Sequence, residues 1–281
     1  MARAIGVLLA LAVVLTGCSA PSTALPAGIT VSVFQTRFDG ALHQLQIRVA
    51  NGTADALEVT GATFESSRFA EPASFDRAQT VPAGSARDLP VLLGDPECGD
   101  EPIRDAVELS FSRADGSPAT AVVVLEETDI VTAINEKDCL DAAVASHATI
   151  TPPAAASWTP GAGAPAQLDF TVTPTAAPGT LTVRSARDTP LLSLVDDSGS
   201  HVTELRLDAV IDADSGAVLL RLLVEPSRCD PHAIAEDKQG TLFPFDVDTS
   251  DGRAGRIVVP VSDDVRSSLY DFFADYCGLP Y

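Results

Sequence analysis

Apolar residues recur at every second position in many short segments of the chain, which is the pattern of half-buried β-strands. Five segments show it most clearly, namely residues 45–49, 107–111, 170–172, 218–224 and 243–247. Dipeptides typical of tight turns, such as Asn51-Gly52 and Asp251-Gly252, separate several of these segments. Because strands do not alternate with long helices, the pattern predicts antiparallel sheets packed as β-sandwiches.

Helical spacing of apolar residues appears in two segments. Ser262 is a suitable N-cap for a helix in which Val265 and Leu269 share one face. A weaker counterpart spans residues 128–139, with Ile130 and Ile134 on one face. We interpret both helices as short elements that pack against an end of a sandwich.

The second half of the chain repeats the first. Residues 92–98 resemble residues 222–229, since both contain a leucine pair, a proline and a terminal cysteine. In both halves an Asp-Gly turn, a β-branched run, a helical pattern and a second cysteine then follow. The offset of about 131 residues indicates an internal duplication.

The duplication predicts how four cysteines pair. It matches Cys98 with Cys139 in the first repeat and Cys229 with Cys277 in the second. The alternative is a zinc site built from thiolates, but such sites use closely spaced cysteine pairs, and these four cysteines lie far apart in the sequence. We therefore expect one disulfide in each repeat.

A segment rich in alanine and proline, residues 142–166, separates the repeats and predicts a stiff, extended linker. We expect Trp158, the only tryptophan, to pin this linker against a domain. The predicted domains are residues 29–141 and 167–281. The predicted fold is all-β with minor α: two tandem immunoglobulin-like antiparallel β-sandwich domains, each with a short C-terminal helix and one disulfide.

The N-terminus has the features of an export signal. Arg3 precedes an apolar run of eleven residues, Ile5 to Leu15, which is too short for a membrane-spanning helix. The run ends at Leu15-Thr16-Gly17-Cys18, which resembles the bacterial lipobox. The resemblance implies that residues 1–17 are a cleaved signal peptide and that a palmitate-type diacylglycerol is attached to Cys18. Residues 18–28 would then tether the protein to the extracytoplasmic face of the bacterial cell membrane.

Composition and charge exclude one class of partner. The chain has 39 acidic and 18 basic residues, for a net charge of -21. Phosphate backbones would repel such a chain, so no nucleic acid partner is expected. We also expect no cofactor, because the sequence has neither a phosphate-binding loop nor a Gly-x-Ser-x-Gly nucleophile motif.

The densest cluster of chemically active residues spans residues 228–238. If Pro231 opens a helical turn, His232 and Glu236 lie on one face, where they could bind a divalent ion with Asp230 or Asp237. The alternative interpretation makes Asp230 the N-cap and Pro231 the first residue of a short helix. The other histidines, His43, His147 and His201, fall in separate segments.

Residues 246–252 contain three aspartates and suggest a calcium loop. Their spacing departs from that of an EF-hand, because the third Asp comes one place late and the twelfth residue is Ile257. A weak calcium site and an ordinary solvated acidic turn both stay open as interpretations.

The paired cysteines, together with Arg228-Cys229-Asp230-Pro231-His232-Ala233 and Glu236-Asp237-Lys238, are similar to those of two-repeat secreted lipoproteins of high-GC Gram-positive bacteria. That resemblance implies a location and an architecture but no enzymatic activity. We expect a lipid-anchored binding or envelope-accessory protein, not an enzyme, whose partner is an envelope or extracellular protein or glycan. The alternative is a metal-dependent hydrolase centred on Asp230, His232 and Glu236.

Overall fold

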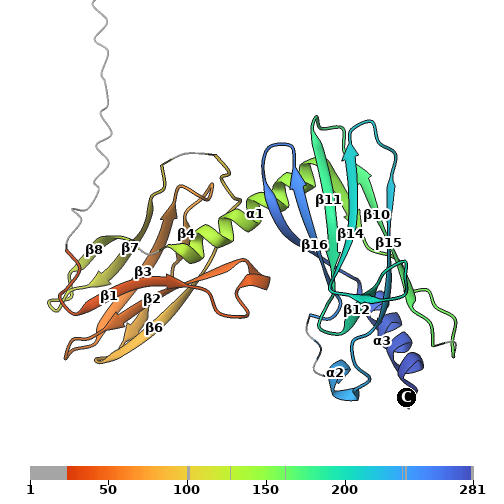
Figure 1. Cartoon of the computed structure of the whole chain (residues 1–281). Coiled ribbons are helices and arrows are strands. Elements are labelled where there is room, and N and C mark those ends of the chain that lie inside the picture. Colours follow the sequence, from red (N-terminus) through yellow and green to blue (C-terminus); the bar gives the residue numbers. More distant parts are fainter. Residues whose placement is uncertain are drawn as a thin grey trace, which may run out of the picture. The chain divides into compact units, whose positions relative to one another are not determined.

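The computed structural model describes residues 24–99, 102–126, 128–161, 163–235, 237 and 239–279 (Figure 1). The signal segment, the lipobox and Cys18 lie outside these residues. The chain divides into two compact units, Met1–Thr132 and Ala133–Tyr281. Each unit contains an antiparallel β-sandwich, as the sequence predicts. No helix within the described residues has the length and apolar character needed to cross a membrane.

Two antiparallel sheets form the first sandwich. One has the order β1-β2-β6, with β1 (Ile29–Phe34), β2 (Gln44–Asn51) and β6 (Ser85–Leu92). The other has the order β4-β3-β7-β8, with β3 (Leu57–Ser66), β4 (Ala73–Phe75), β7 (Asp105–Ser112) and β8 (Pro118–Val124), and the short β5 (Gln79–Val81) pairs with β3. The predicted alternation is confirmed, because Leu45, Ile47 and Leu109 are fully buried between the sheets.

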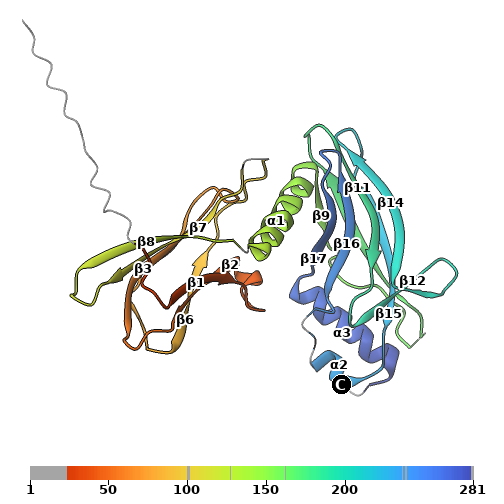
Figure 2. The same ribbon diagram turned by 60° about the vertical axis from the view of Figure 1, so that its left-hand side comes forward.

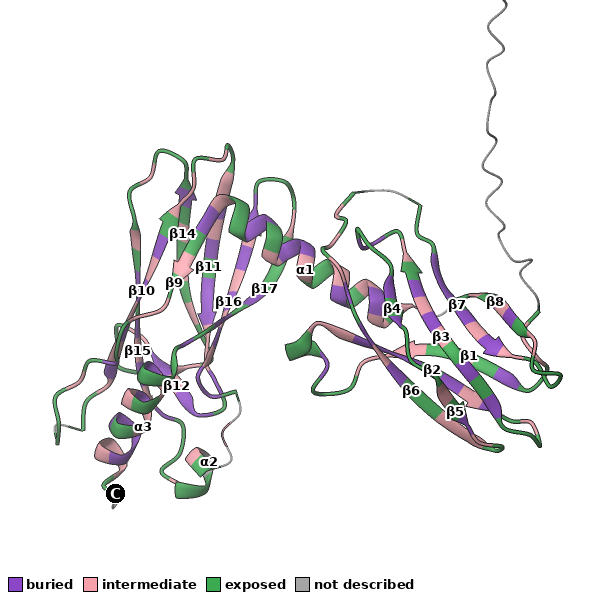
Figure 3. Cartoon of the chain, turned by 180° about the vertical axis from the view of Figure 1, so that it is seen from behind, coloured by how far each residue is buried: buried purple, intermediate pink, exposed green. Residues whose placement is uncertain are grey.

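The second sandwich also has two sheets. The first has the order β13-β12-β15-β10-β9, with β9 (Ala148–Thr151), β10 (Ala166–Pro174), β12 (Leu192–Val195), β13 (His201–Val202) and β15 (Val218–Pro226). The other has the order β14-β11-β16-β17, with β11 (Thr180–Arg187), β14 (Glu204–Asp212), β16 (Leu242–Thr249) and β17 (Ala254–Pro260). The buried residues of each unit lie between its two sheets (Figure 3). Phe170, Phe243 and Phe245 are central to this core, with ring centroids 5.2 to 5.3 Å apart.

The internal duplication is visible in the strand order. The order β1-β2-β6 recurs as β9-β10-β15, and β4-β3-β7-β8 recurs as β14-β11-β16-β17. Even a local irregularity is repeated, because β3 shifts register against β7 between Val59 and Gly61, and β11 shifts against β16 between Val183 and Ser185. The two halves therefore share one topology.

The predicted C-terminal helix is confirmed as α3 (Asp263–Cys277). The hydroxyl of Ser262 accepts the backbone N–H of Val265 (3.3 Å), and Gly278 ends the helix in the left-handed conformation with a φ of 61°. Val265 and Leu269 are buried, as predicted. Figure 2 shows α3 across one end of the second sandwich, beside the short α2 (Pro231–Ala235), and α3 contacts β15.

The segment between the repeats differs from the extended linker expected over residues 142–166. Helix α1 (Asp129–His147) runs eight residues beyond the predicted end, and β9 follows it directly and pairs with β10. Leu140 and Val144 are buried in the core of the second unit. The physical reason is that residues 142–145 are alanine and valine, which continue a helix, whereas the prolines begin only at Pro152.

Trp158 has the predicted anchoring role. Its indole Nε1 donates a hydrogen bond to Asp275 on α3 (3.2 Å), and its ring contacts Phe272 edge-on with centroids 5.8 Å apart. The backbone N–H of Gly161 also donates to Asp275. These contacts fasten the segment before β10 to α3.

The cysteines that the structure describes are all disulfide-bonded. Cys229 is bonded to Cys277, as predicted, and this bond joins the start of α2 to the end of α3. Cys98 and Cys139 are likewise disulfide-bonded.

Candidate functional site

The cluster predicted from residues 228–238 lies around α2. Pro231 is the first residue of this helix, and the carboxylate of Asp230 accepts the backbone N–H of His232 (3.0 Å). The His232 side chain is exposed, and Glu236 lies outside the described residues. The geometry of Asp230 and Pro231 is that of a helix start, which was the alternative interpretation.

Asp237 is a structural junction. Its Oδ1 accepts the backbone N–H groups of Gln239 (3.0 Å) and Gly240 (2.5 Å), and its Oδ2 accepts the hydroxyl of Tyr270 on α3 (3.0 Å). Burial, assisted by the hydrogen bond to Asp237 and by its charge, raises the pKa of Tyr270 to about 12. A Cβ at position 240 would lie 2.3 Å from the Leu191 side chain, so only glycine fits at this position.

The metal role predicted for this cluster stays a prediction, because Glu236 lies outside the described residues. Both oxygens of Asp237 already accept hydrogen bonds from the loop before β16 and from α3. In the part of the chain that the structure describes, no three His, Cys, Asp or Glu side chains converge on a point where a metal ion could bind. Asp230 and Asp237 instead stabilise a helix start and a loop.

Another polar cluster lies beside the Cys229–Cys277 disulfide. Glu225 on β15 is 2.6 Å from Nε2 of His201 on β13. Burial and a hydrogen bond to Glu225 raise the pKa of Tyr276 on α3. An imidazole held by a carboxylate is one component of hydrolytic triads. Among the described residues, however, no hydroxyl or thiol bonds Nδ1 of His201. Sequence reasoning missed this cluster, because the two-residue β13 has no recognisable strand pattern.

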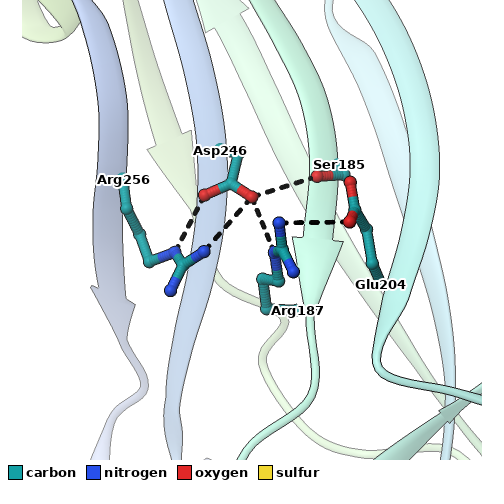
Figure 4. Close-up of polar contacts among 5 residues, drawn as sticks. All are labelled: Ser185, Arg187, Glu204, Asp246 and Arg256. Atoms are coloured by element: carbon teal, nitrogen blue, oxygen red, sulfur yellow. Dashed lines mark hydrogen bonds and ion pairs between the residues drawn. The ribbon is translucent and has the colours of Figure 1, made fainter.

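The outer face of β14-β11-β16-β17 has an arginine–carboxylate network (Figure 4). The carboxylate of Asp246 accepts hydrogen bonds from Arg256 (2.8 Å) and Arg187 (2.7 Å), and more weakly from Ser185 (3.3 Å). Arg187 also pairs with Glu204 (3.1 Å). The hydrogen bond from Arg256, together with that from Arg187, outweighs burial and holds the pKa of Asp246 below its usual value.

The three aspartates of the acidic segment 246–252 contact different neighbours. Asp248 pairs with Arg184, and Asp251 accepts the hydroxyl of Thr249 in the β16–β17 turn. Together with Asp246 beside its two arginines, the three aspartates thus have three different sets of partners. The described carboxylates do not gather around one cation, and Gly252 completes an ordinary hairpin turn with a φ of 89°.

In the first domain, Asp39 organises the loop between β1 and β2. Asp39 is buried, its Oδ2 accepts the backbone N–H of Thr36 (2.5 Å), and its Oδ1 accepts the amide of Gln46 (2.8 Å). Burial raises the pKa of Asp39, but the hydrogen bonds from Thr36 and Gln46 outweigh it and the net pKa is lowered. The ionised carboxylate therefore holds this loop in place.

The loop presents large apolar side chains to solvent. Phe38 is 68% exposed and Leu42 is 58% exposed, and Leu92 at the end of β6 is 64% exposed. Leu92 lies opposite Gln44, two residues from Leu42, in the β2–β6 pairing. We name these three side chains the Phe38 patch (Phe38, Leu42 and Leu92). No sequence pattern predicts the patch, because its residues come from a loop and a strand end.

Two open cavities also belong to the first unit. One, of about 680 Å³, is lined by residues 65–67 and 102–104, among others, and the buried ion pair Arg68–Asp105 (3.7 Å) lies next to it. The other, of about 650 Å³, lies at a sandwich end and is lined by residues 53, 55–58 and 111–114, with Pro26 and Ile29. None of the residues predicted to bind metal lines either cavity.

Comparisons with known proteins give no family. No family model matches the chain, and no curated protein matches it. Among solved structures, the chain is similar to red sea bream transglutaminase (14% identity, TM-score 0.26), covering 84% of this chain but only 31% of that one. It is also similar to the calcium-binding domain CBD12 of CALX1.1 (11% identity, TM-score 0.24, 80% and 78% covered). The B domain of a biofilm-associated protein is a third (9% identity, TM-score 0.24, 85% and 86% covered).

Proposed function

We propose that the chain is a lipid-anchored extracytoplasmic binding protein and that the Phe38 patch contacts an envelope or extracellular protein. The patch carries the proposal, because exposed large apolar side chains gathered on one loop and an adjoining strand end are typical of a binding surface. Aromatic side chains are also enriched where proteins bind one another.

The proposed location is supported by sequence and by covalent structure. Cys18 ends a lipobox-like motif after an apolar export signal. The disulfide-bonded cysteines of the chain fit an oxidising compartment outside the cytoplasm. Two acyl chains on Cys18 would suffice for stable membrane attachment.

The Phe38 patch is also held ready for binding. The hydrogen bonds of Asp39 fix the loop, and the guanidinium of Arg37 lies over the ring of Phe38, 4.9 Å from its centroid. A loop that is already ordered loses less conformational entropy on binding than a mobile one.

The binding test is capture from envelope extract by the chain carrying Cys18→Ser. We expect the double variant Phe38→Ser/Leu42→Ser to lose the captured protein, while Val258→Ser, which removes an exposed apolar side chain from β17, retains it. Equal capture by all three would overturn the assigned surface. Repeating the capture with a chelator distinguishes the metal-dependent hydrolase alternative, because binding through the Phe38 patch needs no metal and should be unaffected.

The anchoring test is mass spectrometry of the natural protein. We expect the mature chain to begin at a diacylated Cys18 and to fractionate with membranes, and Cys18→Ser to release it. An unmodified Cys18 on a released protein would contradict the anchor without affecting the binding test.

A further inference from the structure

Strand β8 lies at the edge of its sheet. In the order β4-β3-β7-β8 it pairs with β7 over its whole length, from Pro118 to Val124. On its other side, no strand pairs with it among the described residues. An edge of this kind can hydrogen-bond to a further strand.

The backbone geometry shows which residues face the open edge. Leu125 donates its N–H to the carbonyl of Asp105 (2.9 Å), and Arg113 donates to the carbonyl of Ser117 (2.8 Å). Since antiparallel strands alternate, the odd-numbered residues between 117 and 125 hydrogen-bond to β7. The N–H and C=O groups of Val122 and Val124 therefore point away from the sheet, toward the open edge.

The side chains of this edge are apolar and exposed. Val122 is 49% exposed and Val124 is 69% exposed, because both face away from the core. No residue from Pro118 to Val124 is charged, although the chain has a net charge of -21. β8 is thus a neutral strip on an acidic molecule.

The duplicated domain provides a direct comparison. β17 occupies the place of β8 in the second sandwich, and its Arg256 and Pro260 correspond to Thr120 and Val124 of β8. A charge and a proline are two of the features by which edge strands avoid pairing with other chains. β8 lacks both at these positions.

Other long edges carry similar protection. β14 has charged residues along its length and a positive φ of 44° at Asp208, next to a register shift, and β6 contains Arg87, Asp88 and Pro90. β1 is uncharged, but its outward Phe34 is covered by the guanidinium of Arg48, 4.4 Å from the ring centroid. β8 is the long edge that combines exposed valines with neither charge nor cover.

We propose that β8 pairs antiparallel with β8 of a second copy of this chain, so that two sheets join into one. The molecule is acidic, so a strand that joins this edge should itself carry no acidic residue. β8 of a second copy is such a strand, because none of its residues is charged. With the two-fold axis at Val122, each Val122 lies opposite its copy and each Thr120 lies opposite Val124.

The test is sedimentation equilibrium of the chain carrying Cys18→Ser. We expect a dimer whose dissociation constant falls as salt is added, because salt screens the repulsion between two acidic molecules. Val122→Lys should weaken dimerisation by at least about tenfold, since it places like charges opposite each other at the edge. The matched control is Val258→Lys at the corresponding position of β17, which should leave the dimer unchanged.

Two controls keep the result interpretable. Val124→Lys should act in the same direction as Val122→Lys, and circular dichroism should show that both variants retain the β fold. Val122→Cys should cross-link two chains on oxidation faster than Val258→Cys does. A wild-type chain that is monomeric at all salt concentrations, or a dimer insensitive to both lysine variants, would overturn the proposal.

Discussion

At the scale of single residues, buried and half-buried carboxylates connect segments that are distant in the sequence. Asp246 connects three strands through Arg187 and Arg256, Asp237 connects a loop to α3 through Tyr270, and Asp39 orders the β1–β2 loop. The hydrogen bonds accepted by Asp246 and by Asp39 lower the pKa of each and favour its ionised form. Stability should therefore depend on pH at defined residues.

Asp246→Asn tests the arginine–carboxylate network. The folded-state pKa of Asp246 lies below the ordinary value of 3.8, so its contribution is present above that pH and is lost as the pH falls through the folded-state pKa. We expect the variant to lose about 1 kcal/mol at neutral pH and to show a weaker dependence on acid. Urea unfolding at a series of pH values measures this.

Asp208→Asn is the matched control, because the Arg206–Asp208 pair is well exposed and should contribute less than about 0.5 kcal/mol. The same acid dependence in Asp246→Asn as in the wild type would exclude the assigned role of Asp246.

Tyr270→Phe tests the junction at Asp237. The tyrosine pKa is raised from 10.0 to about 12, so its contribution is complete below pH 10 and is lost as the pH rises toward 12. We expect a loss of about 0.5 to 1.5 kcal/mol, since the half-buried Asp237 loses one hydrogen-bond donor. In a titration followed by tyrosinate absorbance, Tyr270→Phe should lack the step near pH 12.

Asp237→Asn tests the same contact from the other side. The titration step of Tyr270 should move to lower pH in this variant, and an unmoved step would contradict the pairing.

At the scale of elements, the helix that follows the first sandwich contributes to the second. Leu140 and Val144 of α1 are buried with the core of the second unit, and Gly255 on β17 is so close to Leu140 that a Cβ there would lie 2.9 Å from it. The sequence predicted the start of this helix but not its length, since its apolar stripe is weak and the alanines around it resemble a linker. Helix propensity and tertiary burial together decide the outcome.

Leu140→Ala tests this packing. We expect the variant to destabilise the second unit by about 2 to 4 kcal/mol, because it removes buried methyl groups and leaves a cavity. Lys137→Ala, at an exposed position of the same helix, should change the free energy of unfolding by less than about 0.5 kcal/mol. Thermal unfolding of both variants gives the comparison, and equal effects would show that Leu140 is not part of the core.

At the scale of the whole molecule, periodicity and duplication predicted the architecture well. Strand alternation located the core, and the repeated cysteine pattern predicted the Cys229–Cys277 bond. The metal site predicted around His232 stays a prediction, because Glu236 lies outside the described residues. Of the other members, His232 is exposed and Asp237 bonds Gly240 and Tyr270. Glu225 and His201 meet only through sheet pairing, and the Phe38 patch arises where a loop meets the end of a strand. Neither contact leaves a local pattern.

The Cys229–Cys277 disulfide should contribute strongly to the second domain. In the chain-entropy model, closing a loop of 48 residues is worth about 4 kcal/mol. We expect the double variant Cys229→Ser/Cys277→Ser to lose a stability of this order while keeping its β content. Denaturant unfolding of the variant and of the wild type measures the difference, and a loss below about 1 kcal/mol would show that the bond constrains little.

The position of Leu140 has a consequence for biosynthesis. A ribosome adds the residues of β17 only after most of the second domain has emerged, and Gly255 follows Leu140 by more than a hundred positions. At about 5 to 20 residues per second, the apolar side of this helix stays uncovered for several seconds or longer. Wherever the chain folds, Leu140 therefore lacks its neighbour on β17 until the last hairpin of the second domain has been added.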